Sequence, residues 1–114
     1  MTVYMIATVQ TDDPEGYKVY SAAARPTIIK AGGWYVGRAN VAGDAEIIEG
    51  DCEPGRYIII AFENREAVLR WYNSPEYQEA IKIREPISKV CIFIVDEVPP
   101  EPGVPTRPWG ELRM

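Results

Sequence analysis

The sequence predicts an α+β domain of the ferredoxin-like type, in which an antiparallel sheet carries helices on one face and the elements follow in the order β-α-β-β-α-β. Four apolar runs have strand composition, and stretches with helical spacing separate the first run from the second and the third from the fourth. With 114 residues, 46% of them hydrophobic, the chain is long enough for one core. We expect this domain over residues 1–98.

The first predicted strand covers residues 2–10, and the first predicted helix follows it directly. Asp13 is a typical N-cap residue, and Pro14 suits the first position of a helix because it lacks the amide hydrogen that would be unpaired there. Pro26 lies inside the helical pattern and should kink or split the helix. The pair Gly32-Gly33 then ends it.

The remaining elements alternate between strand and helix composition. We expect a strand at 34–41, a returning or bulged segment at 45–49, a strand at 56–62, helices at 65–72 and 75–84, and a strand at 89–98. Asn64 and Ser74 precede the two helices as N-caps. In the first of these helices, Val68, Leu69 and Tyr72 have the spacing of an inward face.

Three of the strands are apolar on both alternations, which a sheet with one solvated face would not be. We therefore expect a homodimer in which two sheets face each other. Residues 99–114 hold five of the ten prolines and should form an extended tail. The tail is expected to dock on its own dimer through Trp109 and Leu112, and the alternative is that its 104–108 segment binds another protein.

The overall charge excludes several classes of partner. Twelve basic against seventeen acidic residues give a net charge of −5, which disfavours binding to nucleic acid and to anionic membrane surfaces. Without an apolar stretch of the roughly 20 residues that span a bilayer, the chain is expected to be cytoplasmic. Cys52 and Cys91 lack metal-binding spacing, so we expect reduced thiols, with Cys91 packed as a small hydrophobe.

Histidine is absent from the chain. This excludes Ser-His, Cys-His and His-metal mechanisms, because each needs an imidazole as a base or ligand. Catalysis would have to use carboxylate, arginine, tyrosine, serine, lysine, thiol or backbone groups. Carboxylates at or near the strands include Glu49 and Glu63, which we consider as candidate proton acceptors.

The stretch from Trp71 to Gln78, which reads Trp-Tyr-Asn-Ser-Pro-Glu-Tyr-Gln, together with Arg84, resembles the signature of the bacterial family called domain of unknown function 1330. Further features stand in the family's order. They are the Asp-Pro helix start, Pro26, Gly32-Gly33, Arg38, Glu49-Gly50 and Arg56. The resemblance covers residues 1 to about 98.

The resemblance implies a dimeric α+β barrel, with a small cleft between sheet and helices in each subunit. The superfamily includes muconolactone isomerases, quinone-forming monooxygenases and polyketide cyclases, which mostly work without a cofactor. This chain departs from the family pattern at Arg38-Ala39-Asn40, where Arg-Gly-Gly is typical. It departs again at Ala61-Phe62-Glu63, where Glu-Phe-Pro is common, so the family's strand carboxylate is absent.

Arg38 is the leading candidate site residue. It alternates with Trp34, Val36 and Asn40, so a face turned toward the helices would point its guanidinium into the cleft. Arginine binds a carboxylate through two parallel hydrogen bonds. The competing interpretation is a structural ion pair with Glu49. Because alanine occupies position 61, we expect a buried Arg38 to lack its usual protein partner and to take a ligand anion instead.

The other candidates are mainly aromatic. Tyr72 is considered as a donor to a developing oxyanion, although core packing is the simpler role for it and for Trp71. Ser74 is better explained as an N-cap than as a substrate contact. The remaining residues proposed to shape the cleft are Trp34, Asn40, Tyr20 and Tyr77.

Three functions remain open on the sequence. The first is a small cofactor-free isomerase, lyase or cyclase acting on a small anionic or enolisable molecule. The second is a non-catalytic module that binds a small ligand or serves as a structural dimer. The third is a cofactor-free monooxygenase of electron-rich aromatics, which the same fold would accommodate.

Overall fold

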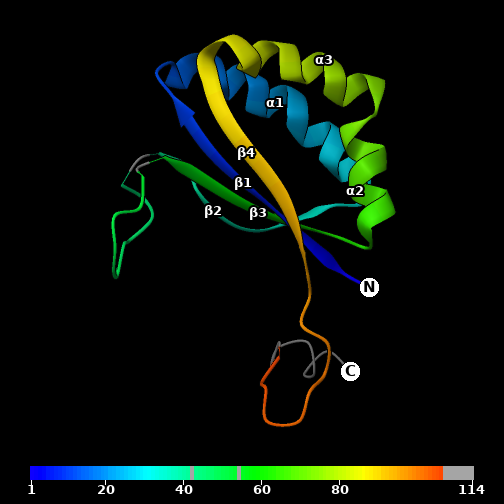
Figure 1. Ribbon diagram of the computed structural model, residues 1–114. Helices are drawn as coiled ribbons and strands as arrows, with labels where there is room; N and C mark the ends of the chain where they lie inside the picture. Colours follow the sequence, from blue (N-terminus) through cyan, green and yellow to red (C-terminus); the bar gives the residue numbers. More distant parts are fainter. Residues whose placement is uncertain (42, 54, 107–114) are drawn as a thin grey trace.

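The protein folds as one four-stranded antiparallel sheet with α1 and α3 side by side over one face, as the sequence predicts (Figure 1). The computed structural model describes residues 1–41, 43–53 and 55–106. The strand order is β2-β3-β1-β4, so β2 and β4 are the edges. The elements are β1 (Val3–Thr11), α1 (Pro14–Lys30), β2 (Trp34–Ala39), β3 (Arg56–Phe62), α2 (Arg65–Tyr72), α3 (Pro75–Arg84) and β4 (Ser88–Asp96).

The predicted helix starts are confirmed in detail. Asp13, Asn64 and Ser74 each accept a hydrogen bond from the backbone amide three residues further on, at 2.9, 2.8 and 3.2 Å. Pro26, however, does not split α1, which runs through it as one helix of 17 residues. A proline removes one helical hydrogen bond, and burial of Ala24 and Ile28 on either side offsets that loss.

The predicted second half of the β2 hairpin is wrong. β2 ends at Ala39, and residues 45–49 form no strand. The Asp44 carboxylate accepts hydrogen bonds from the backbone amides of Asn40 and Val41, at 3.1 and 3.2 Å. Because these bonds close a turn directly after β2, the chain leaves the sheet there instead of returning along it.

A β-bulge in β2 decides which side chains face the helices. Tyr35 pairs with Ile60 and Gly37 with Ile59, so Val36 is an extra residue in the ladder. Ile60 faces the helices, and so does Ile58, which lies opposite Arg38. Tyr35 and Arg38 therefore share the inner face, although they are three residues apart. Strict alternation, which would put Trp34 beside Arg38, fails here.

The two faces of the sheet differ in what covers them. Inner residues such as Met5 and Ile60, each 2% exposed, form the core with α1, α2 and α3. Outer residues such as Trp34 and Phe93 are 45% and 44% exposed. Cys91 also lies outside and is exposed, so the prediction that it packs as a small hydrophobe is wrong for the single chain. The strand alternation puts its neighbours Val90 and Ile92 inside instead.

The described part of the tail leaves the domain beyond the end of β4 (Figure 1). A turn closes there, where the Val104 amide donates to the Glu101 carbonyl at 3.1 Å. The residues expected to dock the tail, Trp109 and Leu112, lie outside the described residues, and docking stays a prediction.

Candidate functional site

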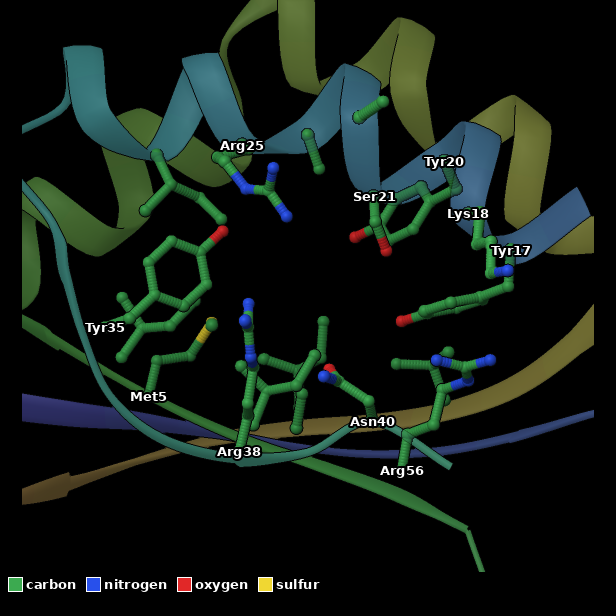
Figure 2. Close-up of a pocket in the computed structure, with 18 of the residues that line it drawn as sticks. Met5, Tyr17, Lys18, Tyr20, Ser21, Arg25, Tyr35, Arg38, Asn40 and Arg56 are labelled. Atoms are coloured by element: carbon green, nitrogen blue, oxygen red, sulfur yellow. The ribbon is translucent and has the colours of Figure 1, made fainter. Parts of the chain in front are cut away.

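A cleft of about 400 Å³ lies between α1 and the inner face of the sheet, and residues of all four strands line it (Figure 2). This volume suits a small organic molecule. Its floor is the inner face of the sheet, and its roof is the face of α1 that carries Tyr17, Ser21 and Arg25. β2 is an edge strand, so no further strand lies beyond it on that side of the cleft.

Four basic side chains line the cleft, and none of its described lining residues is acidic. Lys18 and Arg25 come from α1, Arg38 from β2 and Arg56 from β3. Within the described part of the chain, the three arginines form no ion pair, while Lys18 pairs with the exposed Glu15 at 3.3 Å. A protein with a net charge of −5 has thus gathered uncompensated positive charge in one place.

The bulge brings Arg38 into this cleft, although two parts of the sequence argument for it are wrong. Its side chain is exposed rather than buried, because β2 is an edge strand and water reaches it. Its guanidinium therefore keeps its hydration. Ala61 pairs with Trp34 on the outer face, so an acid at position 61 would not have faced Arg38 within the subunit.

Tyr17 and Arg56 form one end of the cleft. The Arg56 guanidinium carbon lies 5.0 Å from the centre of the Tyr17 ring, in cation–π geometry. Burial, with the nearby Tyr77, raises the pKa of the Tyr17 hydroxyl to about 12. This hydroxyl points into the cleft (Figure 2) and stays protonated at neutral pH, so it acts as a hydrogen-bond donor.

A buried aromatic cluster forms the back wall. The Tyr20 and Tyr77 hydroxyls are 2.7 Å apart, and the Trp71 and Tyr77 rings are 4.1 Å apart between centres. Burial raises the pKa of Tyr20 far above its usual range. Burial also lowers the pKa of the adjacent Arg84, but hydrogen bonding and charge interaction with Tyr77 outweigh it and raise that pKa overall. This wall therefore presents neutral aromatic side chains, and the charged Arg84 guanidinium lies against the Tyr20 ring.

The structure brings together five of the ten residues predicted for the site. Arg38, Asn40, Tyr20, Trp71 and Tyr77 all line the cleft. Trp71 combines this role with core packing, since it is 2% exposed and its indole donates to the Thr27 hydroxyl at 2.9 Å.

The other five predicted residues lie elsewhere. Trp34 is on the outer face of the sheet, and Ser74 caps α3. Tyr72 is 38% exposed and lines a separate groove with Arg84, because α2 turns Ala67, Val68 and Trp71 inward instead. Glu63 and Glu49 are exposed and line no part of the cleft. The ion pair considered between Arg38 and Glu49 is absent from the described residues.

The sequence reasoning missed five side chains of the site, namely Tyr17, Lys18, Ser21, Arg25 and Tyr35. A signal for part of this set was present, because Lys18, Ser21 and Arg25 are spaced i, i+3 and i+7 and must share one face of a helix. Tyr35 left no such signal, since it faces the cleft only because of the bulge. Arg56 was noted only as a family residue.

No group of three or more Cys, Asp or Glu side chains is arranged to hold a metal ion among residues 1–41, 43–53 and 55–106. No helix in this part of the chain is both long and apolar enough to cross a membrane.

The strand order and the helices over one face define an α+β protein with the ferredoxin-like fold. Within that class, the chain belongs to the family of the domain of unknown function DUF1330, whose model matches residues 2–98. No protein with a curated description matches the chain.

Solved structures support the same fold. A protein of unknown function from Rhodopseudomonas palustris is 19% identical, with a TM-score of 0.71 over 87% of this chain and 84% of that one. SnoaB, a cofactor-independent oxygenase from Streptomyces nogalater, is 13% identical, with a TM-score of 0.63 over 89% and 97%. A dimeric ferredoxin-like protein of unknown function from Bacteroides fragilis is 14% identical, with a TM-score of 0.54 over 83% and 95%.

Proposed function

We propose that the cleft binds a small organic anion, and that the protein is a cofactor-free enzyme that catalyses an isomerase, lyase or cyclase type of reaction on it. One observation carries the proposal: arginines from α1, β2 and β3 line a single cleft whose described lining contains no acid. Arginine is suited to this task because its planar fork binds a carboxylate or an enolate oxygen with two hydrogen bonds.

The reaction that fits these side chains passes through an oxyanion. Arg38 and Arg25 favour the ionised form of an enolisable substrate, because a negative charge that develops beside them is stabilised. Tyr17 donates a hydrogen bond from its protonated hydroxyl, which is the role the sequence had given to Tyr72. Since no described lining residue is a carboxylate, the substrate proton passes to solvent, and Glu49 and Glu63 take no part.

The same absence of a carboxylate favours a second candidate, the cofactor-free monooxygenase. An electron-rich phenol or quinol ionises beside arginine without needing a protein base, and its anion reacts with oxygen directly. SnoaB shows that this fold accommodates a cofactor-independent oxygenase. Oxygen uptake with a quinol panel separates this candidate from the isomerase, lyase and cyclase group. A ligand that binds but is neither oxidised nor otherwise converted would favour the remaining possibility, a non-catalytic module that only binds its ligand.

We also propose that two subunits pair through the outer faces of their sheets. The exposed apolar side chains there, Trp34, Phe93 and Val95, are 45%, 44% and 41% exposed in the single chain. A second copy would remove them from water. Similar proteins of this fold from Bacteroides fragilis and Thermobifida fusca are dimeric.

The test of the anion site is thermal stabilisation by small organic acids, aromatic acids, lactones and quinols. A ligand at one hundred times its dissociation constant adds about 2.7 kcal/mol to the free energy of unfolding. We expect Arg38→Gln to cut this gain by about half or more, as a tenfold weaker dissociation constant would, while its own unliganded stability stays within about 0.5 kcal/mol of the parent protein. Arg70→Gln, on the exposed end of α2, is the matched control and should keep the gain.

Three results would overturn the proposal. The first is that no acid stabilises the protein at millimolar concentration. The second is that Arg38→Gln and Arg70→Gln lose the stabilisation equally, which would mean that the anions bind by net charge rather than in the cleft. The third is strong destabilisation of unliganded Arg38→Gln, which would assign Arg38 a structural role.

A further inference from the structure

The basic side chains of the cleft fall into two groups along its length. On α1, Lys18 and Arg25 are seven residues apart, which separates their backbone positions by about 10 Å. Figure 2 shows the same division: Arg25 lies at one end near Tyr35, and Lys18 lies at the other end beside Tyr17.

The floor of the cleft repeats this separation independently. Arg38 pairs with Ile58 of β3, and Arg56 lies two residues before Ile58 on the same strand. The backbone positions of the two arginines are therefore about 7 Å apart along the strand direction. Because β2 runs parallel to β1 and α1 runs back over the sheet, Arg38 comes below Arg25, and Arg56 comes below Tyr17 and Lys18 (Figure 2). Roof and floor thus form two cationic poles, Arg25 with Arg38 and Lys18 with Arg56.

Two uncharged polar side chains lie between the poles. Ser21 lies on the roof between Lys18 and Arg25, and Asn40 stands on the floor between Arg38 and Arg56 (Figure 2). Both side chains donate and accept hydrogen bonds without preferring either sign of charge. A carbonyl or hydroxyl group of a ligand could form hydrogen bonds with these two side chains, whereas a third acidic group there would have no cation beside it.

We infer that the ligand is a small dicarboxylate with one acid group at each pole and a neutral polar group between them. This inference rests on the proposed function, because it specifies the anion that the cleft takes. A monoanion would engage one pole and leave the arginine of the other pole without an anionic partner, because within the described residues only Lys18 among the four cations has an acidic protein partner, Glu15. A compact dianion such as sulfate, whose charge is shared by four oxygens around one sulfur, would be too small to reach both poles.

The test compares acids that differ only in the number and spacing of their charges. We would measure dissociation constants calorimetrically for succinate, glutarate, adipate and pimelate, for hexanoate as the monoacid that matches adipate, and for sulfate. The best dicarboxylate should bind about tenfold tighter than hexanoate, since a charge-assisted hydrogen bond is worth 1.5 kcal/mol or more. Affinity should pass through a maximum along the dicarboxylate series, and sulfate should bind more weakly than the best dicarboxylate.

Variants of one pole at a time then locate the two acid groups. Arg25→Gln and Lys18→Gln remove one exposed cation from each pole, and neither side chain belongs to the core. Each should weaken the best dicarboxylate about tenfold, whereas hexanoate should respond to one of them only. Arg70→Gln should leave both ligands unchanged.

The outcomes separate this inference from the proposed function. Equal binding of hexanoate and all dicarboxylates, with loss in Arg38→Gln, would overturn the two-pole ligand and leave the anion site standing. Sulfate that binds as tightly as the best dicarboxylate would show one undivided cationic patch and would also overturn it. If none of the acids binds, both the inference and the proposed function fail.

Discussion

The two faces of the sheet are built from similar side chains but meet different surroundings. On the inner face, Met5 and Ile60 are almost completely buried under the helices. On the outer face, Trp34 and Phe93 keep nearly half of their surface exposed. An apolar alternation therefore indicates which residues share a face, but not what covers that face. The cleft lies where the inner face itself changes, from an apolar core to a region where four cations from α1 and the sheet face a common space.

The outer face gives the largest expected effect, because one substitution acts twice in a symmetric interface. Phe93→Asp would place a carboxylate from each subunit in the centre of an apolar contact, at a cost of several kcal/mol for each unpaired charge. We expect the mass in solution, measured by light scattering, to fall from that of two chains to that of one. The inner core does not include Phe93, so the single chain should stay folded.

The control for this experiment is Val19→Asp, on the exposed side of α1, where Val19 is 59% exposed. It should leave the mass unchanged. A parent protein that already has the mass of one chain would refute the pairing of the outer faces, and the apolar side chains there would need another partner.

The inner face gives the next largest effect, at Trp71. This side chain stacks against Tyr77 and Phe62, with ring centres 4.1 and 5.8 Å away, and is 2% exposed. Trp71→Ala should lower the free energy of unfolding in urea by about 3–5 kcal/mol. Leu69→Ala, on the same helix but 54% exposed, should change it by less than about 0.5 kcal/mol. Similar losses in both variants would contradict the inward face of α2.

Most of the fold was predictable because its signals are local. Asp13-Pro14, Asn64 and Ser74-Pro75 each satisfy backbone amides at a helix start, and this depends on a few neighbouring residues only. The apolar strands likewise reveal themselves by composition. The 45–49 segment shows the limit of such reasoning, since hydrogen bonds to Asp44 decide against a strand that composition allowed.

The site was less predictable because it depends on side-chain direction. One bulged residue, Val36, reverses the alternation of β2, so that Tyr35 joins the cleft and Trp34 leaves it. On α2, the spacing predicted Val68, Leu69 and Tyr72 as the inner residues. The helix instead buries Trp71 against Phe62 and leaves Leu69 and Tyr72 outside, because of how it packs on the sheet. Neither outcome is encoded in a local pattern, so the arginine cleft emerged only when α1, β2 and β3 were assembled.

Tyr17 stands at the boundary between the core and the cleft, and it gives the smallest of these effects. The pKa of its hydroxyl is about 12 in the folded protein, chiefly because of burial, against 10.0 as the ordinary value. The fold therefore favours the neutral phenol, and this preference is fully present below pH 10. As the pH rises from 10 to 12, Tyr17 ionises in the unfolded chain before it ionises in the folded protein. The free energy of unfolding therefore falls by about 2 kcal/mol over this range.

The measurement is the free energy of unfolding in urea between pH 9 and pH 12, for the parent protein and for Tyr17→Phe. Lysines and the other tyrosines titrate in both proteins, so the difference between the two curves isolates Tyr17. We expect the parent to lose about 2 kcal/mol more than the variant over this range. Parallel curves would mean that the Tyr17 hydroxyl is as well hydrated in the fold as in the unfolded chain. Tyr17 would then belong to the open cleft rather than to the core, and its place as a protonated donor would rest on its ordinary acidity alone.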